Sequence, residues 1–134
     1  MGLEYARQLA AKGFDLILVS NRQEELEQAQ EELSRTSTVK VITRFQDLAR
    51  QNAADELMAF CQEQSMEVEI LINNAGMFFF EELTPENEAK VLAMMQLHIY
   101  TPTRLCLLFG EEMKRRGHGY LINMSSMAAK LPYL

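Results

Sequence analysis

The chain has 134 residues, of which 48% are hydrophobic, and its formal net charge is -6. A chain of this length forms one domain with a single core, and its hydrophobic content excludes a disordered polymer. The negative charge argues against a surface for nucleic acid or for an anionic membrane, because both require a basic face.

The next features are possible membrane-spanning runs, export signals and the two cysteines. No apolar run approaches the roughly 20 residues that a membrane-spanning helix needs. Met1 leads directly into Gly-Leu-Glu-Tyr without the basic-then-apolar pattern of a secretory signal, so we expect a cytoplasmic protein. Cys61 and Cys106 lie in helical patterns without metal-ligand spacing, which favours two buried free thiols and no metal site.

The first half of the chain predicts alternating helices and strands. Residues 2–12 predict a helix with one apolar face, and Gly13 supplies its C-terminal stop. Residues 14–19 predict a strand, and a polar turn leads from it into a helix over 23–33 that is rich in Glu and Gln. A second strand over 40–45 follows.

The second half continues the same alternation. We expect a helix over 51–64, a buried strand over 70–72, a helical segment over 84–116 and a last strand over 120–124. The long segment begins with Thr84 as a hydroxyl cap and Pro85 at its first position, and Pro102 interrupts it. Strands that alternate with helices require right-handed crossovers, which predicts an α/β fold with a doubly wound parallel sheet.

Polar residues cluster where the predicted strands end. The segments that follow the strands are Ser20–Arg22, Gln46–Leu48, Asn73–Gly76 and Ser125–Ser126. Because a ligand crevice lies at the carboxyl ends of parallel strands, we expect these segments to border one site.

These motifs, in this order, resemble the short-chain dehydrogenase/reductase family. The matching pieces are Gly2 opening a helix, Asp47-Leu48, Asn73-Asn74-Ala75-Gly76 and Ile122-Asn123-Met124-Ser125-Ser126. The resemblance implies a Rossmann-like fold, with residues 1–134 forming a partial dinucleotide-binding domain. It also implies that the family's first strand and its C-terminal third have no counterpart in this sequence.

By that resemblance, Gly2 is the last glycine of a loop that presents helix N–H groups to a pyrophosphate. Arg22 stands where the family contacts the adenosine ribose, and a guanidinium there favours the 2′-phosphate of NADP over NAD. The alternative for Arg22 is a solvated turn residue. Whether the chain keeps enough of the site to bind the cofactor stays open at this stage.

The other residues that the resemblance assigns to the cofactor follow the predicted strands over 40–45 and 70–72. Asp47 and Leu48 frame the adenine, although Asp47 is also a candidate helix cap. Asn74, Ala75 and Gly76 complete the cofactor-binding set. Met77–Phe80 could wall a substrate pocket or only cover the edge of the sheet.

The resemblance assigns two candidate catalytic residues. Ser126 matches the family's serine, whose hydroxyl bonds the substrate oxygen. His98 stands where many members have an asparagine. Because Pro102 has no N–H, the carbonyl of His98 lacks its helical partner and could hold a water on a proton relay. The alternative is a packed histidine beside an ordinary proline kink.

The family's catalytic Tyr and Lys lie beyond the end of this sequence. Tyr133 is too close to Ser126 to take the tyrosine's role, and no lysine follows it. We therefore expect a fragment of an NADP-dependent oxidoreductase that acts on a carbonyl or secondary alcohol and is inactive as given. The alternatives are a non-catalytic nucleotide-binding or interaction module and a fragment without function.

The missing first strand has a structural consequence. In the family it lies between the strands that correspond to 14–19 and 70–72, so both would present unpaired backbone groups to an empty slot. We expect the chain to form a homo-oligomer or to rearrange its sheet around the gap. A small-molecule substrate is the partner expected of the complete enzyme, with no nucleic acid and no membrane.

Overall fold

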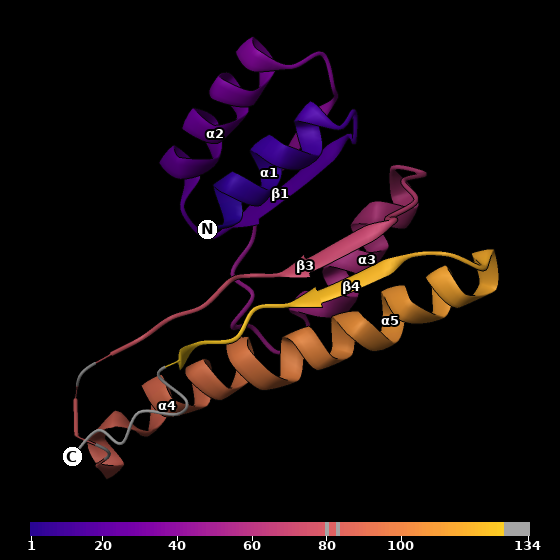
Figure 1. The fold of residues 1–134 in the computed structure, drawn as a ribbon. Helices are drawn as coiled ribbons and strands as arrows, with labels where there is room; N and C mark the ends of the chain where they lie inside the picture. The colour runs from indigo at the N-terminus through magenta and orange to yellow at the C-terminus, as the bar shows by residue number, and fades with distance from the viewer. Residues whose placement is uncertain (80, 83, 128–134) are drawn as a thin grey trace.

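The computed structural model describes residues 1–79, 81–82 and 84–127 of the chain. Helices and parallel strands alternate along these residues, which confirms the expected α/β class (Figure 1). The elements are α1 (Gly2–Ala11), β1 (Leu16–Ser20), α2 (Gln23–Thr36), β2 (Val41–Phe45), α3 (Ala53–Glu63), β3 (Ile70–Asn73), the 3₁₀ turn η1 (Pro85–Asn87), α4 (Glu88–Met95), the π-helical turn η2 (Gln96–Tyr100), α5 (Thr101–Arg116) and β4 (Tyr120–Asn123).

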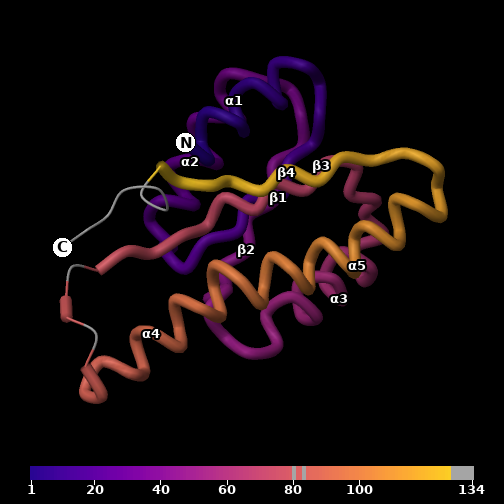
Figure 2. Tube along the Cα trace, turned by 60° about the horizontal axis from the view of Figure 1, so that its bottom comes forward, coloured from indigo at the N-terminus to yellow at the C-terminus, as the bar shows by residue number. Residues whose placement is uncertain are grey.

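The four strands form two separate two-stranded sheets. β1 pairs in parallel with β2, and β3 pairs in parallel with β4. Helices α1 and α2 lie on one side of the strands, and α3 and α5 lie on the other (Figures 1 and 2). The strands therefore lie between two helical layers, which is why their sequences are apolar on both faces.

Two apolar clusters divide the core between these layers. The upper cluster consists of Ala6, Ala10, Leu16 and Leu33, which join α1 and α2 to β1. The lower cluster consists of Ala54, Leu57, Cys61, Leu71, Leu105, Phe109 and Met113, which join α3 and α5 to β3. Side chains of β1 alternate between the clusters, because successive residues of a strand point to opposite faces.

The gap between the sheets stays open. Among the described residues, no backbone hydrogen bond joins β1 to β3, and no Cα of β1 lies within 8 Å of a Cα of β3. Of the two alternatives expected, a sheet rearranged around the gap is not what the described residues show. Ile17 and Val19 of β1 pack on the same lower cluster as Leu71 of β3, so that cluster holds both strands at separate places. The homo-oligomer stays a prediction.

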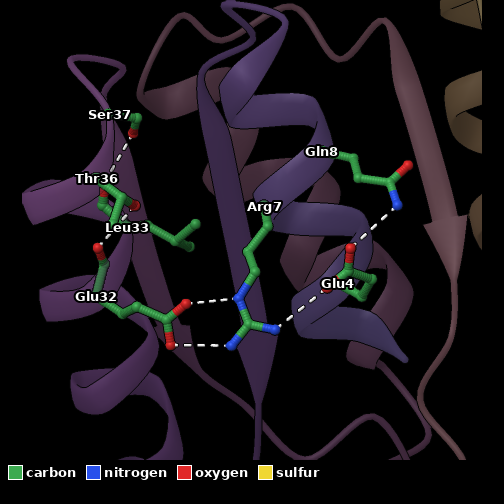
Figure 3. A network of polar contacts seen from close by, with 7 residues as sticks. All are labelled: Glu4, Arg7, Gln8, Glu32, Leu33, Thr36 and Ser37. Atoms are coloured by element: carbon green, nitrogen blue, oxygen red, sulfur yellow. Dashed lines mark hydrogen bonds and ion pairs between the residues drawn. The ribbon is translucent and has the colours of Figure 1, made fainter.

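Helix α1 is firmly seated although no strand lies beside β1 on the gap side. The guanidinium of Arg7 makes a two-point contact with the Glu32 carboxylate of α2, at 2.5 and 3.1 Å (Figure 3). Arg7 also donates to Glu4, 3.2 Å away. Together with the burial of Ala6 and Ala10, this contact holds α1 against α2 and β1.

The helix ends follow the sequence with two differences. Gly13 and Gly117 adopt φ of 87° and 84°, as expected of glycines that end helices. Thr84 occupies the cap position but makes no capping hydrogen bond; it bonds Glu86 instead and lowers the pKa of that carboxyl. The predicted interruption at Pro102 takes the form of the π-turn η2, in which Thr101 N–H donates to the carbonyl of Gln96.

Candidate functional site

A cavity of about 1940 Å³ lies between the two sheets, and its lining includes the segments that follow β1, β2 and β3 as well as residues before these strands. Eight of the nine residues that the sequence singles out line it: Gly2, Arg22, Asp47, Leu48, Asn74, Ala75, Gly76 and His98. They come from five separate parts of the chain. The structure therefore brings these residues to one cavity, and their binding roles stay predictions.

Gly2 lies directly against Asn74. A Cβ placed on Gly2 would stand 2.7 Å from Nδ2 of Asn74, which is closer than real Cβ contacts. The start of α1 and the side chain of Asn74 thus approach so closely that a Cβ at Gly2 would require the Asn74 amide to move. Because the first N–H groups of a helix have no partner within it, this end of α1 offers donors to an anion in the cavity.

Arg22 begins α2 at the rim of the cavity. Its side chain is 72% exposed and forms an ion pair with Glu25, with Nη1 3.0 Å from Oε1. The Arg22 N–H bonds the hydroxyl of Ser20, 3.2 Å away, which fixes the turn after β1. The exposed guanidinium therefore keeps donors for a second anion while Glu25 engages one end of it.

Asp47 and Leu48 form the turn that follows β2. The Asp47 carboxylate accepts from the N–H of Ala49 at 2.9 Å, so the side chain serves the turn itself. The alternative role of a helix cap is wrong, because α3 (Ala53–Glu63) has Asn52 at its N-cap position and Asp47 bonds the turn before it. The bond to Ala49 leaves the second carboxylate oxygen of Asp47 for other donors, and this bond is compatible with a position of Asp47 beside an adenine.

Two buried polar residues hold this turn in place, and of these the sequence analysis missed Thr101. Thr101, 1% exposed, donates its hydroxyl to the carbonyl of Leu48 at 2.8 Å. Gln46, 7% exposed, donates to the carbonyl of Ala53 at 2.8 Å. Thr101 lies next to Pro102, and a polar residue in the apolar stripe of a helix was the signal that could have identified it.

His98 contacts the loop after β3 through its side chain. Its Nε2 lies 3.0 Å from the backbone N and 2.8 Å from the backbone O of Met77. A Cβ on Gly76 would stand 2.9 Å from Cε1 of His98. The side chain is thus packed on the loop after β3 and braces it. The role of its carbonyl stays a prediction.

Ser126 does not line the cavity. It lies exposed beyond the end of β4, in the last described part of the chain. Beside it, Asn73 donates to the side-chain oxygen of Asn123 at 2.8 Å and to the sulfur of Cys106 at 3.4 Å, which ties β3, β4 and α5 together. Asn73 and Asn123 are thus structural amides. Phe80 and Tyr133 lie outside the described residues.

The two thiols differ in their surroundings. Cys61 is 3% exposed, and burial raises the pKa of its thiol. Cys106 is only half-buried, so the expectation of two buried thiols is correct for Cys61 alone. The described residues hold no group of three or more His, Cys, Asp or Glu side chains able to bind a metal ion. In the same part of the chain, no helix combines the length and the apolar character needed to cross a bilayer.

A comparison with family models identifies the fold. The model described as short chain dehydrogenase matches residues 1–134. The chain belongs to the short-chain dehydrogenase/reductase family. The sequence resemblance and the fold class that it implied are therefore confirmed.

Individual relatives agree with the family assignment. Mouse 17-beta-hydroxysteroid dehydrogenase type 3 is 28% identical over 99% of this chain, which spans 44% of that protein. A bulky-bulky ketone specific alcohol dehydrogenase from Comamonas testosteroni superposes with a TM-score of 0.87 at 25% identity, covering 98% of this chain and 52% of that one. L-sorbose reductase from Gluconobacter frateurii, solved with NADPH and L-sorbose, superposes at 0.85 and 26% identity, covering 96% and 49%. The chain thus spans about half the length of these relatives.

The cavity of this short-chain dehydrogenase chain has the features that a dinucleotide requires. The first turn of α1 begins at the cavity, where a pyrophosphate would accept from its free backbone N–H groups. Arg22 supplies a positive charge to the lining, and Leu48 supplies an apolar side chain. These are the groups that would hold the family's cofactor.

Proposed function

We propose that this chain binds NADP in the cavity between its two sheets, as part of an oxidoreductase that acts on a carbonyl or secondary alcohol. The observation that carries the proposal is the meeting of Gly2, Arg22, Asp47 and Asn74 around one hollow. Bound NADP would supply the hydride carrier. The chain's own residues bind and orient it.

The proposed roles follow the order of the strand ends. The N–H groups at the start of α1 hold the pyrophosphate, and Arg22 engages the 2′-phosphate. Asp47 and Leu48 lie against the adenine, and the backbone of Ala75 and Gly76 borders the nicotinamide half. L-sorbose reductase, a relative with a solved NADPH complex, supports NADP as the cofactor.

Catalysis needs a proton as well as a hydride. In the proposed assignment Ser126 bonds the substrate oxygen, while a Tyr and a Lys exchange the proton. The 134 residues contain no tyrosine after Ser126 that is followed four positions later by a lysine. We therefore propose that this chain by itself binds the nucleotide without transferring hydride. The location that we propose for it is the cytoplasm.

Fluorescence titration with NADPH and with NADH tests the proposal. We expect measurable binding of NADPH and weaker binding of NADH. Arg22→Ala removes the charge for the 2′-phosphate and should weaken NADPH binding by about 10-fold or more, while NADH binding stays unchanged. Arg35→Ala, at the far end of α2, is the matched control. Equal loss of both nucleotides, or no binding of either, would reject the proposed site.

A non-catalytic interaction module is the second candidate function. The specific observation that favours it is the open space between β1 and β3, which has backbone edges on both sides. The two candidates differ in what enters the space, and they are not exclusive.

A further inference from the structure

Two opposite charges from the start of α2 lie side by side at the cavity. Arg22 and Glu25 both line it, and their side chains are 72% and 61% exposed. Nη1 of Arg22 lies 3.0 Å from Oε1 of Glu25. An anion that approaches Arg22 from the cavity therefore meets a guanidinium that already has a carboxylate beside it. Arg22 has a role in the proposed function, and Glu25 has none.

The backbone holds both residues in place. The Arg22 N–H bonds the hydroxyl of Ser20 at 3.2 Å, and the Arg22 carbonyl accepts from the N–H of Leu26 at 3.2 Å. Leu26 is 4% exposed and anchors the first turn of α2 in the core. Because the backbone of Arg22 is bonded on both sides, its guanidinium can move only by side-chain rotation. Glu25 precedes Leu26 in the same turn and stays equally close to the cavity.

The ion pair is one that a second anion can open. An exposed pair between residues three positions apart on a helix is weak, because water screens both charges. A phosphate monoester carries about −1.5 to −2 charges at neutral pH, which exceeds the single charge of a carboxylate. Such a phosphate can displace Glu25 from Arg22. It does so against the charge of Glu25, which remains in the same helical turn.

The group on the adenosine ribose decides whether Glu25 opposes a nucleotide. NADP carries a phosphate at the 2′ position, and NAD carries a hydroxyl there. A hydroxyl has no net charge, so a nearby carboxylate does not repel it and can accept its hydrogen bond. The pyrophosphate is common to both nucleotides. Glu25 should therefore act on the binding of NADP and leave that of NAD unchanged.

We propose that Glu25 is a specificity-determining residue of the nucleotide site. Its carboxylate competes with the 2′-phosphate of NADP for the guanidinium of Arg22, which lowers the preference for NADP over NAD. The inference rests on the proposed function, in which Arg22 engages that phosphate. Removal of the Glu25 charge frees Arg22 for the phosphate.

Glu25→Gln tests the proposal, because it keeps the size of the side chain and removes its charge. NADPH and NADH are titrated by fluorescence at low salt. We expect NADPH to bind about threefold to fivefold more tightly than to the parent chain, with NADH binding unchanged. The readout is the ratio of the two dissociation constants, since a disturbed fold or pyrophosphate site would shift both. An unchanged ratio would overturn the proposal.

Glu24→Gln is the matched control. Glu24 also lies in the first turn of α2, but it is not among the described residues that line the cavity. Both variants remove one negative charge from the same helix end and change its interaction with the helix dipole alike. The control should leave the ratio of dissociation constants unchanged. An equal gain in both variants would assign the effect to the overall charge of α2 and overturn the proposal.

A double variant tests whether Glu25 acts through Arg22. In Arg22→Ala the carboxylate has no guanidinium to compete for. Adding Glu25→Gln to that variant should therefore improve NADPH binding by less than about twofold. The full threefold to fivefold gain in both backgrounds would refute competition for Arg22.

Salt separates a charge effect from a change in shape. Raising the ionic strength from about 0.01 M to about 1 M shortens the Debye length from about 30 Å to about 3 Å. The advantage of Glu25→Gln over the parent chain in NADPH binding should then fall below about twofold. A gain that is independent of salt would contradict the proposed competition between charges.

The titrations distinguish failure of this inference from failure of the proposed function. If the parent chain binds neither NADPH nor NADH, the proposed function is rejected, and the role of Glu25 is rejected with it. If the parent chain binds NADPH and Glu25→Gln leaves the ratio unchanged, only the role of Glu25 is rejected.

Discussion

The imidazole of His98 lies against the backbone of Met77, with Nε2 3.0 Å from its nitrogen and 2.8 Å from its oxygen. One ring nitrogen cannot both accept from the N–H and donate to the carbonyl in the same protonation state. The side chain nevertheless braces the loop that leaves β3, since either bond ties α4–α5 to that loop.

We expect His98→Ala to loosen this loop. Amide exchange of Met77 should accelerate, because the variant removes its hydrogen-bond partner. His98→Asn should retain part of the protection, because an amide carries both a donor and an acceptor. The matched control is His118→Ala, at an exposed site near Glu69. Unchanged exchange of Met77 in His98→Ala would contradict a bracing role.

Gly2→Ala should disturb the cofactor site and leave the fold intact. The new methyl group would meet Nδ2 of Asn74 at 2.7 Å, and the amide side chain can turn away from it. We expect weaker NADPH binding with an unchanged urea midpoint. In Gly13→Ala nothing lies within 4 Å of the methyl group, but φ is 87°. That control should lose about 1 kcal/mol of stability and keep its affinity.

Thr101→Val should destabilise the chain by about 1–3 kcal/mol, since it leaves the carbonyl of Leu48 without its buried donor. Urea denaturation measures the change in the free energy of unfolding. Thr103→Val, on an exposed position of the same helix, controls for the β-branched substitution. Equal effects of the two variants would exclude a specific role for the Thr101 hydroxyl.

Acid should weaken the contact between α3 and α5. The Arg104 guanidinium bonds the Asp55 carboxylate at 2.7 Å and lowers the pKa of that carboxyl. A lowered folded-state pKa means that the stabilisation is present above the unfolded value, about 3.9, and is lost as the pH falls through the folded value.

Arg104→Gln should therefore reduce the loss of stability between neutral pH and about pH 3, measured as the shift in urea midpoint. The control Lys12→Gln removes a positive charge at the end of α1. It should leave the loss of stability between neutral pH and about pH 3 unchanged. An identical acid response in the Arg104 variant and the parent chain would contradict this account.

The sequence was most informative where a residue type has one physical use. Gly13 and Gly117 ended helices as expected, because glycine adopts positive φ without strain. The strand-end residues Asn74 and Asp47 reached one cavity because parallel strands present their carboxyl ends at the same edge. Pro102 predicted an irregularity in the long helix. The sequence did not predict that the irregularity takes the form of a π-turn.

Local patterns could not give the contacts between distant segments. The Thr101 bond to Leu48 spans 53 positions, and the Arg7 contact with Glu32 spans 25. Thr84 met the pattern of a cap and bonds Glu86 instead. For Thr101 and Arg7 the partner was selected by how distant segments pack, which a local pattern does not encode.

By itself, the sequence determined the alternation of helices and strands, the family and the set of strand ends around the cavity. Apolar periodicity and turn residues are local properties, and they suffice for these features. Only the tertiary structure decided that the two sheets stay apart. Ile17, Val19 and Leu71 share one apolar cluster on α3 and α5, and this common packing holds β1 and β3 in separate places. Within the described residues no backbone hydrogen bond joins the two strands.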